Sequence, residues 1–352
     1  MGAVTTVTTS PARRQFAAAA LLALAAIVVG VATSSRAAVA GSPPIAWSRL
    51  RNPILRSPDR ALKDPAIVWR AGRWQALFSS VDPAGRWRIG TATSSDLARW
   101  STPGELPHDP AVEGEASPDV GPRPDGSFVV TYQSFVHDAN GGQAKLYYRT
   151  TTDFRTYTPP RPLGRELHPG SPDRMIDAAL AWTPAGLLLG YKFGPPDGVQ
   201  AFEIARSTTG SLDGPWQLIG RPDISVFADT IENYQFLHLG NGWQLLATSN
   251  RFDRPFLFTL AGDPSTAAGW LHWSPGRELR VPQERWNPGR GTTGVTYEHA
   301  NGAFLIDRQP VADRYYLVYA DASEVTRFGG AGHDQLGVAR STDTVRWSVP
   351  PR

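Results

Sequence analysis

Apolar and polar positions alternate along this chain in short runs that glycine-rich or aspartate-rich turns separate. The stretch "KDPAIVWRAGRWQALFSS" shows the repeating unit. An acid, Asp64, precedes an apolar run, a turn at Gly72 follows, and a second apolar run begins at Trp74. Two strands joined by a tight turn have this pattern. No long stretch with 3.6-residue periodicity follows residue 41, so we expect a nearly all-β body.

The unit occurs five times, each time with an acid or a polar residue at the head of its first apolar run. The head residues are Asp64, Asp119, Asp177, Glu232 and His299. A second pattern follows each unit, as in "TATSSDLARWS" and "ARSTDTVRWS": a strand, a Ser/Thr-Asp turn and an aromatic residue that we expect to pack between sheets. Radial repetition of four-stranded sheets is a propeller. The sequence therefore predicts an all-β, five-bladed β-propeller with four-stranded antiparallel blades, and a β-sandwich is the alternative.

The first forty residues have a different composition from the rest. "RRQF", from Arg13, precedes an apolar run, and "AVA", which ends at Ala40, offers a small-residue cleavage site. The arginine pair resembles a twin-arginine export signal. We therefore expect residues 1–40 to be a signal peptide and residues 41–352 to be a single catalytic domain, secreted by the twin-arginine route. An uncleaved anchor is the alternative, because the apolar run approaches the length of a membrane helix.

The charge of the chain excludes one class of partner. The formal net charge is +3, and three of the 35 basic residues but none of the 32 acidic residues lie in the leader. The body is therefore neutral and lacks the basic surface of a nucleic-acid binder. The chain has no cysteine, so no disulfide stabilises it. We expect a monomer that contacts no nucleic acid and, after cleavage of the leader, no membrane.

The head residues indicate the chemistry. The first strand of each propeller blade lines the central axis, so residues that head these strands converge although they are far apart in sequence. Carboxyl groups that gather there perturb one another's pKa values. Glycoside hydrolysis uses such a group, because one carboxylic acid protonates the leaving oxygen while a carboxylate attacks or activates water.

Several short motifs resemble glycoside hydrolase family 43 and the related family 62 over residues 60–349. They are Asp-Pro at Asp64, Ile-Asp at Asp177, Glu232 at the head of the fourth unit, "SPDV" around Asp119, and "SSDLARW". The resemblance implies a five-bladed propeller with Asp64 as general base, Asp177 as pKa-modulating acid and Glu232 as general acid. It implies a supporting place for Asp119 behind these three.

The chain also departs from that resemblance at two of its motifs. Asn233 follows Glu232 where family 43 commonly has Gly-Pro, and Ala178 follows Asp177 where a proline is usual. The fifth head, His299, corresponds to a histidine that family members often place near the axis beside water or Ca²⁺. We take Asp119, Asn233 and His299 as candidate substrate-binding residues. We expect no required cofactor, and the resemblance allows for a Ca²⁺ ion near the axis.

The sequence thus predicts a secreted, inverting, exo-acting glycosidase that removes terminal arabinofuranosyl or xylosyl residues from a carbohydrate substrate. The alternative is a carbohydrate-binding propeller that has lost turnover. The presence of all three acids, Asp64, Asp177 and Glu232, favours the enzyme.

Overall fold

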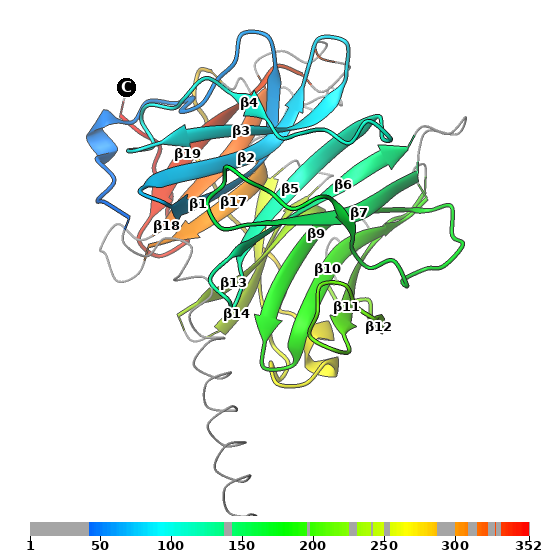
Figure 1. Ribbon diagram of the computed structural model, residues 1–352. Helices are drawn as coiled ribbons and strands as arrows, with labels where there is room; N and C mark the ends of the chain where they lie inside the picture. The colour runs from blue at the N-terminus through cyan, green and yellow to red at the C-terminus, as the bar shows by residue number, and fades with distance from the viewer. Residues whose placement is uncertain are drawn as a thin grey trace, which may run out of the picture.

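Five antiparallel β-sheets surround a common axis in the computed structural model (Figure 1). The structure describes the residue ranges 42–136, 143–195, 198–224, 231–240, 242–249, 254–286, 300–308, 315–322, 328 and 332–351. The predicted signal peptide lies outside these ranges. The all-β, five-bladed propeller that the sequence predicts is confirmed.

The strands follow one another from the axis outward in each of the five blades. They are β1 (Ala61–Arg70), β2 (Arg73–Val81), β3 (Trp87–Ser94) and β4 (Gly104–Glu105) in the first blade; β5 (Gly114–Pro122), β6 (Phe128–Val136), β7 (Gln143–Thr151) and β8 (Arg161–Pro162) in the second; β9 (Arg174–Thr183), β10 (Gly186–Gly194), β11 (Ala201–Ser207) and β12 (Trp216–Gly220) in the third; β13 (Ile231–Leu239), β14 (Gly242–Ser249), β15 (Arg254–Thr259) and β16 (Arg277–Glu278) in the fourth; and β17 (Asn301–Asp307), β18 (Tyr315–Ala322) and β19 (Asp334–Ser341) in the fifth. Two short 3-10 helices, η1 (Trp47–Arg49) and η2 (Ala268–Leu271), complete the described elements.

The fifth blade differs from the other four at its outer edge. Its sheet has three strands in the described part of the chain, and β19 is the outermost. Two isolated bridges lie on that strand, Arg340 with Ser348 and Leu336 with Leu55. Chain from both ends of the propeller therefore lies along β19, in the place that a continuous fourth strand has in the other blades.

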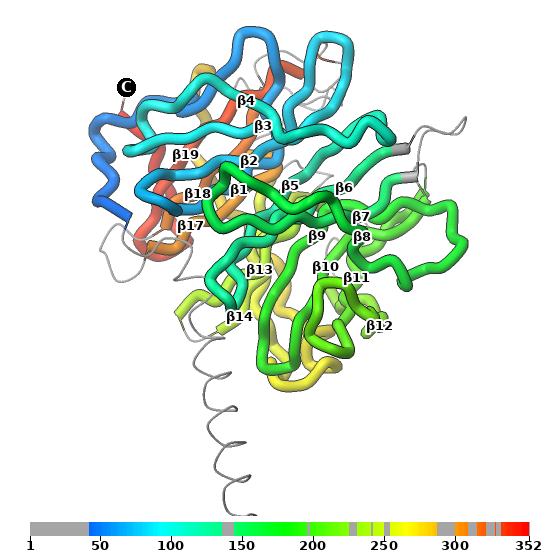
Figure 2. Tube along the Cα trace, in the orientation of Figure 1, coloured from blue at the N-terminus to red at the C-terminus, as the bar shows by residue number. Residues whose placement is uncertain are grey.

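The N-terminal segment closes the ring. Asn52 donates from Nδ2 to the carbonyl of Val338 at 2.9 Å, and its Oδ1 accepts from the amide of Val338 at 2.9 Å. The Asn52 side chain thus makes the two hydrogen bonds that the backbone of a neighbouring strand would make. Figure 2 shows the start of the described chain running beside the C-terminal strand. The contacts of β1 with β17, β18 and β19 place the first and last blades side by side. The ring therefore closes where the N-terminal segment pairs with the outermost described strand of the last blade.

Apolar side chains fill the gaps between the blades. One cluster joins the second and third blades through residues such as Leu146 and Leu189, and another joins the third and fourth, where the rings of Phe202 and Tyr234 lie 4.2 Å apart. The aromatic residues after the Ser/Thr-Asp turns belong to these clusters, as Trp347 does. Their predicted packing role is confirmed.

None of the helices in the described ranges is long and apolar enough to span a bilayer.

Candidate active site

Each of the five inner strands bends at one residue near the end where it begins. At that residue the backbone has a positive φ, and the pairing with the next strand shifts register there. The five residues are Asp64 (φ 50°), Ser117 (φ 49°), Asp177 (φ 57°), Asn233 (φ 53°) and Gly302 (φ 52°). They are structurally equivalent positions, one from each blade, and together they form a ring around the axis.

The residue types at these bends follow from backbone sterics. A side chain with a Cβ is strained at positive φ, and the strain is least for asparagine, aspartate and glycine. Bulges of this kind often lie beside active sites, because they redirect a side chain from the face of the sheet. The bend therefore suits the backbone of Asp64, Asp177, Asn233 and Gly302. It also turns the polar side chains of the first three toward the axis.

Asp64 is held by hydrogen bonds from three side chains. Ser79 Oγ and Ser117 Oγ donate to its Oδ2 at 2.6 and 3.3 Å, and Asn233 Nδ2 donates to its Oδ1 at 3.0 Å. A Cβ at Gly302 would lie 2.8 Å from the same Oδ1, so only glycine leaves room for this carboxylate. Burial raises the pKa of Asp64, and the Ser79 and Ser117 hydrogen bonds oppose that rise.

Asp177 is 5% exposed and lies on the third blade. Its backbone amide donates to Gln133 Oε1 at 2.9 Å, and Gln133 Nε2 donates to Ser117 Oγ at 3.0 Å, so one buried amide joins the second and third blades. Burial raises the pKa of Asp177 to about 6, the neighbouring Glu232 carboxylate adds to the rise, and Lys192 opposes it. The charge of this carboxyl therefore changes in the pH range just below neutral.

Glu232 precedes the bend of the fourth blade by one residue. Lys192 Nζ, on β10 of the third blade, donates to its Oε2 at 3.0 Å. The Lys192 side chain is 3% exposed, whereas that of Glu232 is 26% exposed. Its other oxygen, Oε1, has no hydrogen-bond partner among the residues that the structure describes. Glu232 therefore joins the group through a buried lysine and presents one oxygen for a proton.

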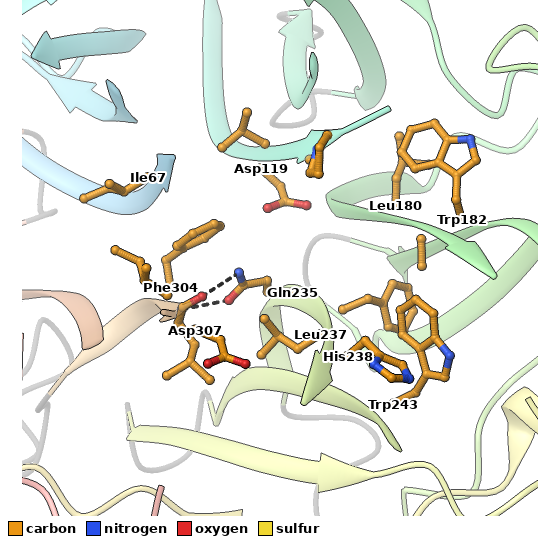
Figure 3. A pocket seen from close by; sticks show the side chains of 17 residues that line it. Ile67, Asp119, Leu180, Trp182, Gln235, Leu237, His238, Trp243, Phe304 and Asp307 are labelled. Atoms are coloured by element: carbon orange, nitrogen blue, oxygen red, sulfur yellow. Dashed lines mark hydrogen bonds between the residues drawn. The ribbon is translucent and has the colours of Figure 1, made fainter. Parts of the chain in front are cut away.

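Asp119 lies two residues beyond the bend of the second blade, farther along the axis. It lines two adjoining cavities, a small one that the five residues of the ring also line and a second of about 70 Å³ lined by residues farther along the same strands. Figure 3 shows Asp119 in the second cavity with Gln235, whose amide is hydrogen-bonded to the backbone of Leu305 at both of its polar atoms. Burial raises the pKa of Asp119 to about 7.

The structure therefore brings together Asp64, Asp177, Glu232 and Asn233 but corrects one expectation about the heads of the strands. Asp119 and Glu232 are not equivalent to Asp64 and Asp177; the equivalent residues of their blades are Ser117 and Asn233. A β-bulge adds a residue to one strand only, so the spacing of acids in the sequence does not reveal which residue occupies the bend.

Sequence reasoning missed four polar residues that hold the acids in place. They are Ser79, Ser117, Gln133 and Lys192. Ser79, Gln133 and Lys192 lie on second strands of their blades, inside apolar runs that read as core. A signal was available for Lys192 alone, because a lone lysine within "LLLGYKFG" is unusual in a buried strand.

His299, the fifth predicted head, lies outside the described residues, so its place near the axis stays a prediction. No cluster of three or more His, Cys, Asp or Glu side chains in the described ranges could hold a metal ion. A Ca²⁺ ion near the axis also stays a prediction.

The geometry supports acid–base chemistry at the ring. Asp64 is oriented by three donors, Glu232 has one oxygen without a partner among the described residues, and Asp177 lies close enough to respond to the charges of both. Carboxyl groups whose environments differ in this way can take opposite roles in one reaction.

Solved structures of carbohydrate-active enzymes share this fold. An α-L-arabinofuranosidase from Lactobacillus brevis has 15% sequence identity and a TM-score of 0.60, and the similarity covers 86% of this chain and 98% of that one. A family 43 endo-arabinanase from Bacillus licheniformis has 11% identity and a TM-score of 0.53, over 81% of this chain and 95% of that one.

A third similar structure belongs to another group. It comes from work on the family 130 mannoside phosphorylases, which contain glycoside hydrolases that target β-1,2 mannosidic linkages in Candida mannan. It has 14% identity and a TM-score of 0.55, over 84% of this chain and 88% of that one. No protein-family model and no curated protein sequence matches the chain. Identities this low establish the fold alone, which agrees with the fold that the motifs implied.

Proposed function

We propose that this protein is an inverting glycoside hydrolase in which Asp64 is the general base, Glu232 the general acid and Asp177 the residue that adjusts the acid. One observation carries the proposal. Three carboxyl groups from the first, third and fourth blades meet at one end of the axis, where Glu232 raises the pKa of both aspartates and Asp64 adds to the rise for Asp177. Several solved structures of the same fold are glycoside hydrolases, which supports the reaction class.

Asp64 suits the role of base because its carboxylate is oriented but not saturated. An ionised carboxylate offers about four acceptor positions. The hydrogen bonds from Ser79, Ser117 and Asn233 use three of them, so one stays free for a water molecule. A base must be ionised to act. Because burial raises the pKa of Asp64, activity should fall on the acidic side at a higher pH than an ordinary aspartate would give.

Glu232 suits the role of acid because one of its oxygens is engaged and the other is accessible. Lys192 fixes Oε2, which orients the carboxyl plane, and Oε1 can carry the proton toward the leaving oxygen. Inverting enzymes hold acid and base about 6.5–9.5 Å apart, so that a water molecule fits between the base and the sugar.

The substrate class is proposed from the motif resemblance and from the names of similar structures. Arabinofuranosyl residues come first and xylosyl residues second, released from chain ends of a polysaccharide or oligosaccharide. We also propose that the mature protein starts near Gly41, is exported, and acts as a monomer without a required cofactor.

A panel of substrates tests the reaction. The mature protein is incubated with 4-nitrophenyl glycosides of arabinofuranose, xylopyranose and mannopyranose, and with plant and bacterial polysaccharides. The matched control is Asp64→Ala. Release of one sugar by the wild-type protein but not by the variant supports the proposal. Binding of a polysaccharide with no release by either protein would favour the carbohydrate-binding propeller instead.

Proton NMR of the first-formed sugar tests the stereochemistry. An inverting enzyme produces the opposite anomer before mutarotation mixes the two. Net retention would mean that a carboxylate attacks the sugar directly, and the assignment of Asp64 as a base would then be wrong.

A further inference from the structure

Lys192 is a buried cation in the middle of the acid cluster. Its side chain is 3% exposed, and the contact that the structure gives its ammonium group is the one with Glu232 Oε2 at 3.0 Å. Lysine is almost never fully buried without a partner, because removal of a charge from water is costly. Lys192 pairs with Ile176 on β9, and Asp177 follows Ile176 in the chain. Lys192 therefore lies between Asp177 and Glu232.

The groups that face this lysine are mostly negative. Glu232 contacts it directly, and Lys192 in turn lowers the pKa of Asp177. Asp64 completes the acid cluster; its own nearby cation is Lys63, which lies 3.6 Å from Asp334 on the fifth blade. The Tyr234 hydroxyl donates to the carbonyl of Ile231 at 2.7 Å. Lys192 is therefore the positive charge that balances the acid side of the cluster.

A cation beside a general acid has a consequence for the reaction. As the acid gives up its proton, its carboxyl group becomes negative, and a fixed positive charge nearby stabilises that product. We propose that Lys192 is the charge partner of the general acid, a positioning residue that stabilises the carboxylate left on Glu232 when the leaving oxygen is protonated. This inference rests on the proposed function.

The O–H bond at Glu232 Oε1 breaks and its proton passes to the glycosidic oxygen. The bond from that oxygen to the anomeric carbon breaks, and the bond pair stays on the oxygen. Water attacks the anomeric carbon and loses a proton to Asp64. Lys192 forms and breaks no bond; it keeps its contact with Oε2 while the charge of Glu232 changes from neutral to negative.

The inference predicts a dependence on the leaving group. Lys192→Met removes the charge and keeps most of the volume, so a folded variant retains Glu232 but as a weaker proton donor. We expect kcat on alkyl glycosides or oligosaccharides, which need protonation, to fall about 10–100-fold, within the usual range for acid catalysis. For a 2,4-dinitrophenyl glycoside, which departs without a proton, we expect a fall of less than about threefold.

The same variant should change the pH profile. Without the cation, Glu232 retains its proton to higher pH, so the alkaline limb should move up by about one unit or more, as expected for loss of an opposite charge at this distance. Lys192→Arg keeps the charge and should stay close to wild type in both measurements. Equal losses on both classes of substrate, with an unmoved alkaline limb, would indicate a merely structural lysine and overturn the inference.

Carbon-13 NMR of labelled glutamate carboxyls provides a readout without a substrate. The signal that disappears in Glu232→Gln identifies Glu232. In Lys192→Met its titration should move to higher pH by about one unit; an unchanged titration would overturn the inference. A panel with no active substrate would contradict the proposed function, whereas the NMR titration would still decide whether Lys192 controls the charge of Glu232.

Discussion

The two ends of the propeller axis are built from the same five strands, yet they hold different chemistry. At the end where the strands begin, a ring of four polar residues and Gly302 surrounds the axis, and its side chains are joined by hydrogen bonds across blades. A few residues farther along, the same strands line a cavity mostly with apolar side chains such as Ile67, Leu180 and Phe304 (Figure 3).

Two aspartates near the axis, Asp177 and Asp119, make the contrast specific. Burial raises the pKa of both, to about 6 for Asp177 and to about 7 for Asp119. Asp177 also responds to Glu232, Lys192 and Asp64, whereas among the described residues the influence on Asp119 besides burial comes from the amide of Val120. A shifted pKa alone therefore does not distinguish a reactive carboxyl from a buried one. The charged neighbours do, and the bend in each strand decides which residues have them.

The largest effect should come from the ring. Asp64→Ala should abolish measurable turnover, a loss of about 10²–10⁴-fold or more, because the attacking water then has no base. Azide, an anion that needs no deprotonation, should restore a product of inverted configuration. Steady-state kinetics with and without azide measures both. A variant that keeps more than a tenth of wild-type activity would place the base elsewhere.

The second prediction compares alanine substitutions at two glycines that have a positive φ. Gly302→Ala would bring a Cβ to 2.8 Å from Asp64 Oδ1, whereas Gly72→Ala, in the turn between β1 and β2, would meet nothing within 4 Å. Both alanines are strained by about 1–2 kcal/mol. We expect both to lower the melting temperature, but only Gly302→Ala to lower kcat, about tenfold or more. Equal activity in both variants would show that the ring tolerates displacement of Asp64.

A smaller effect concerns Asp177. Its pKa is about 6, so its carboxyl is half ionised at that pH and mostly ionised above it, where its negative charge lies beside Glu232. Asp177→Asn removes that charge, so Glu232 loses its proton more readily and the alkaline limb should move to lower pH by about one unit. The pH dependence of kcat measures the shift. An unmoved alkaline limb would mean that Asp177 acts in another way.

The smallest effect on activity should come from the other end of the axis. Asp119→Asn should leave kcat within about threefold of wild type and should stabilise the protein at alkaline pH. A folded-state pKa of about 7 means that the native protein holds this proton more tightly than the unfolded chain, so stability falls as pH rises from about 4 to 7. Asparagine removes that loss, which amounts to a few kcal/mol at most.

Thermal unfolding at two pH values measures the effect of Asp119→Asn. The variant should be more stable than wild type at pH of about 8, and the difference should vanish near pH of about 4. A large loss of activity in this variant would instead support contact between Asp119 and the substrate, and the contrast between the two ends would fail.

Much of the candidate site could be predicted from the sequence, because its acids precede the first apolar run of a repeated unit. Asp64 and Asp177 lie at equivalent bends, where a short polar side chain is favoured for backbone reasons as well as for chemistry. In the second and fourth blades the sequence pattern points to Asp119 and Glu232 as the equivalent residues. Ser117 and Asn233 occupy the bends there instead. Ser117 does not stand out beside Asp119 in the sequence, and Asn233 stands out only as a departure from the motif at Glu232, not as the residue at the bend.

The sequence by itself determined the five-bladed fold. Alternation of apolar and polar residues, turn residues and the trailing aromatics are local signals, and their repetition specifies hairpins that must stack around an axis. The tertiary structure alone decided the register at each bend, the bridges of Leu55 and Ser348 to β19, and the contacts of Lys192, Gln133 and Asn233 across blades. The physical reason is that these features depend on hydrogen bonds between strands and between blades. The sequence pattern of one strand does not show which residues of other strands and blades lie beside it.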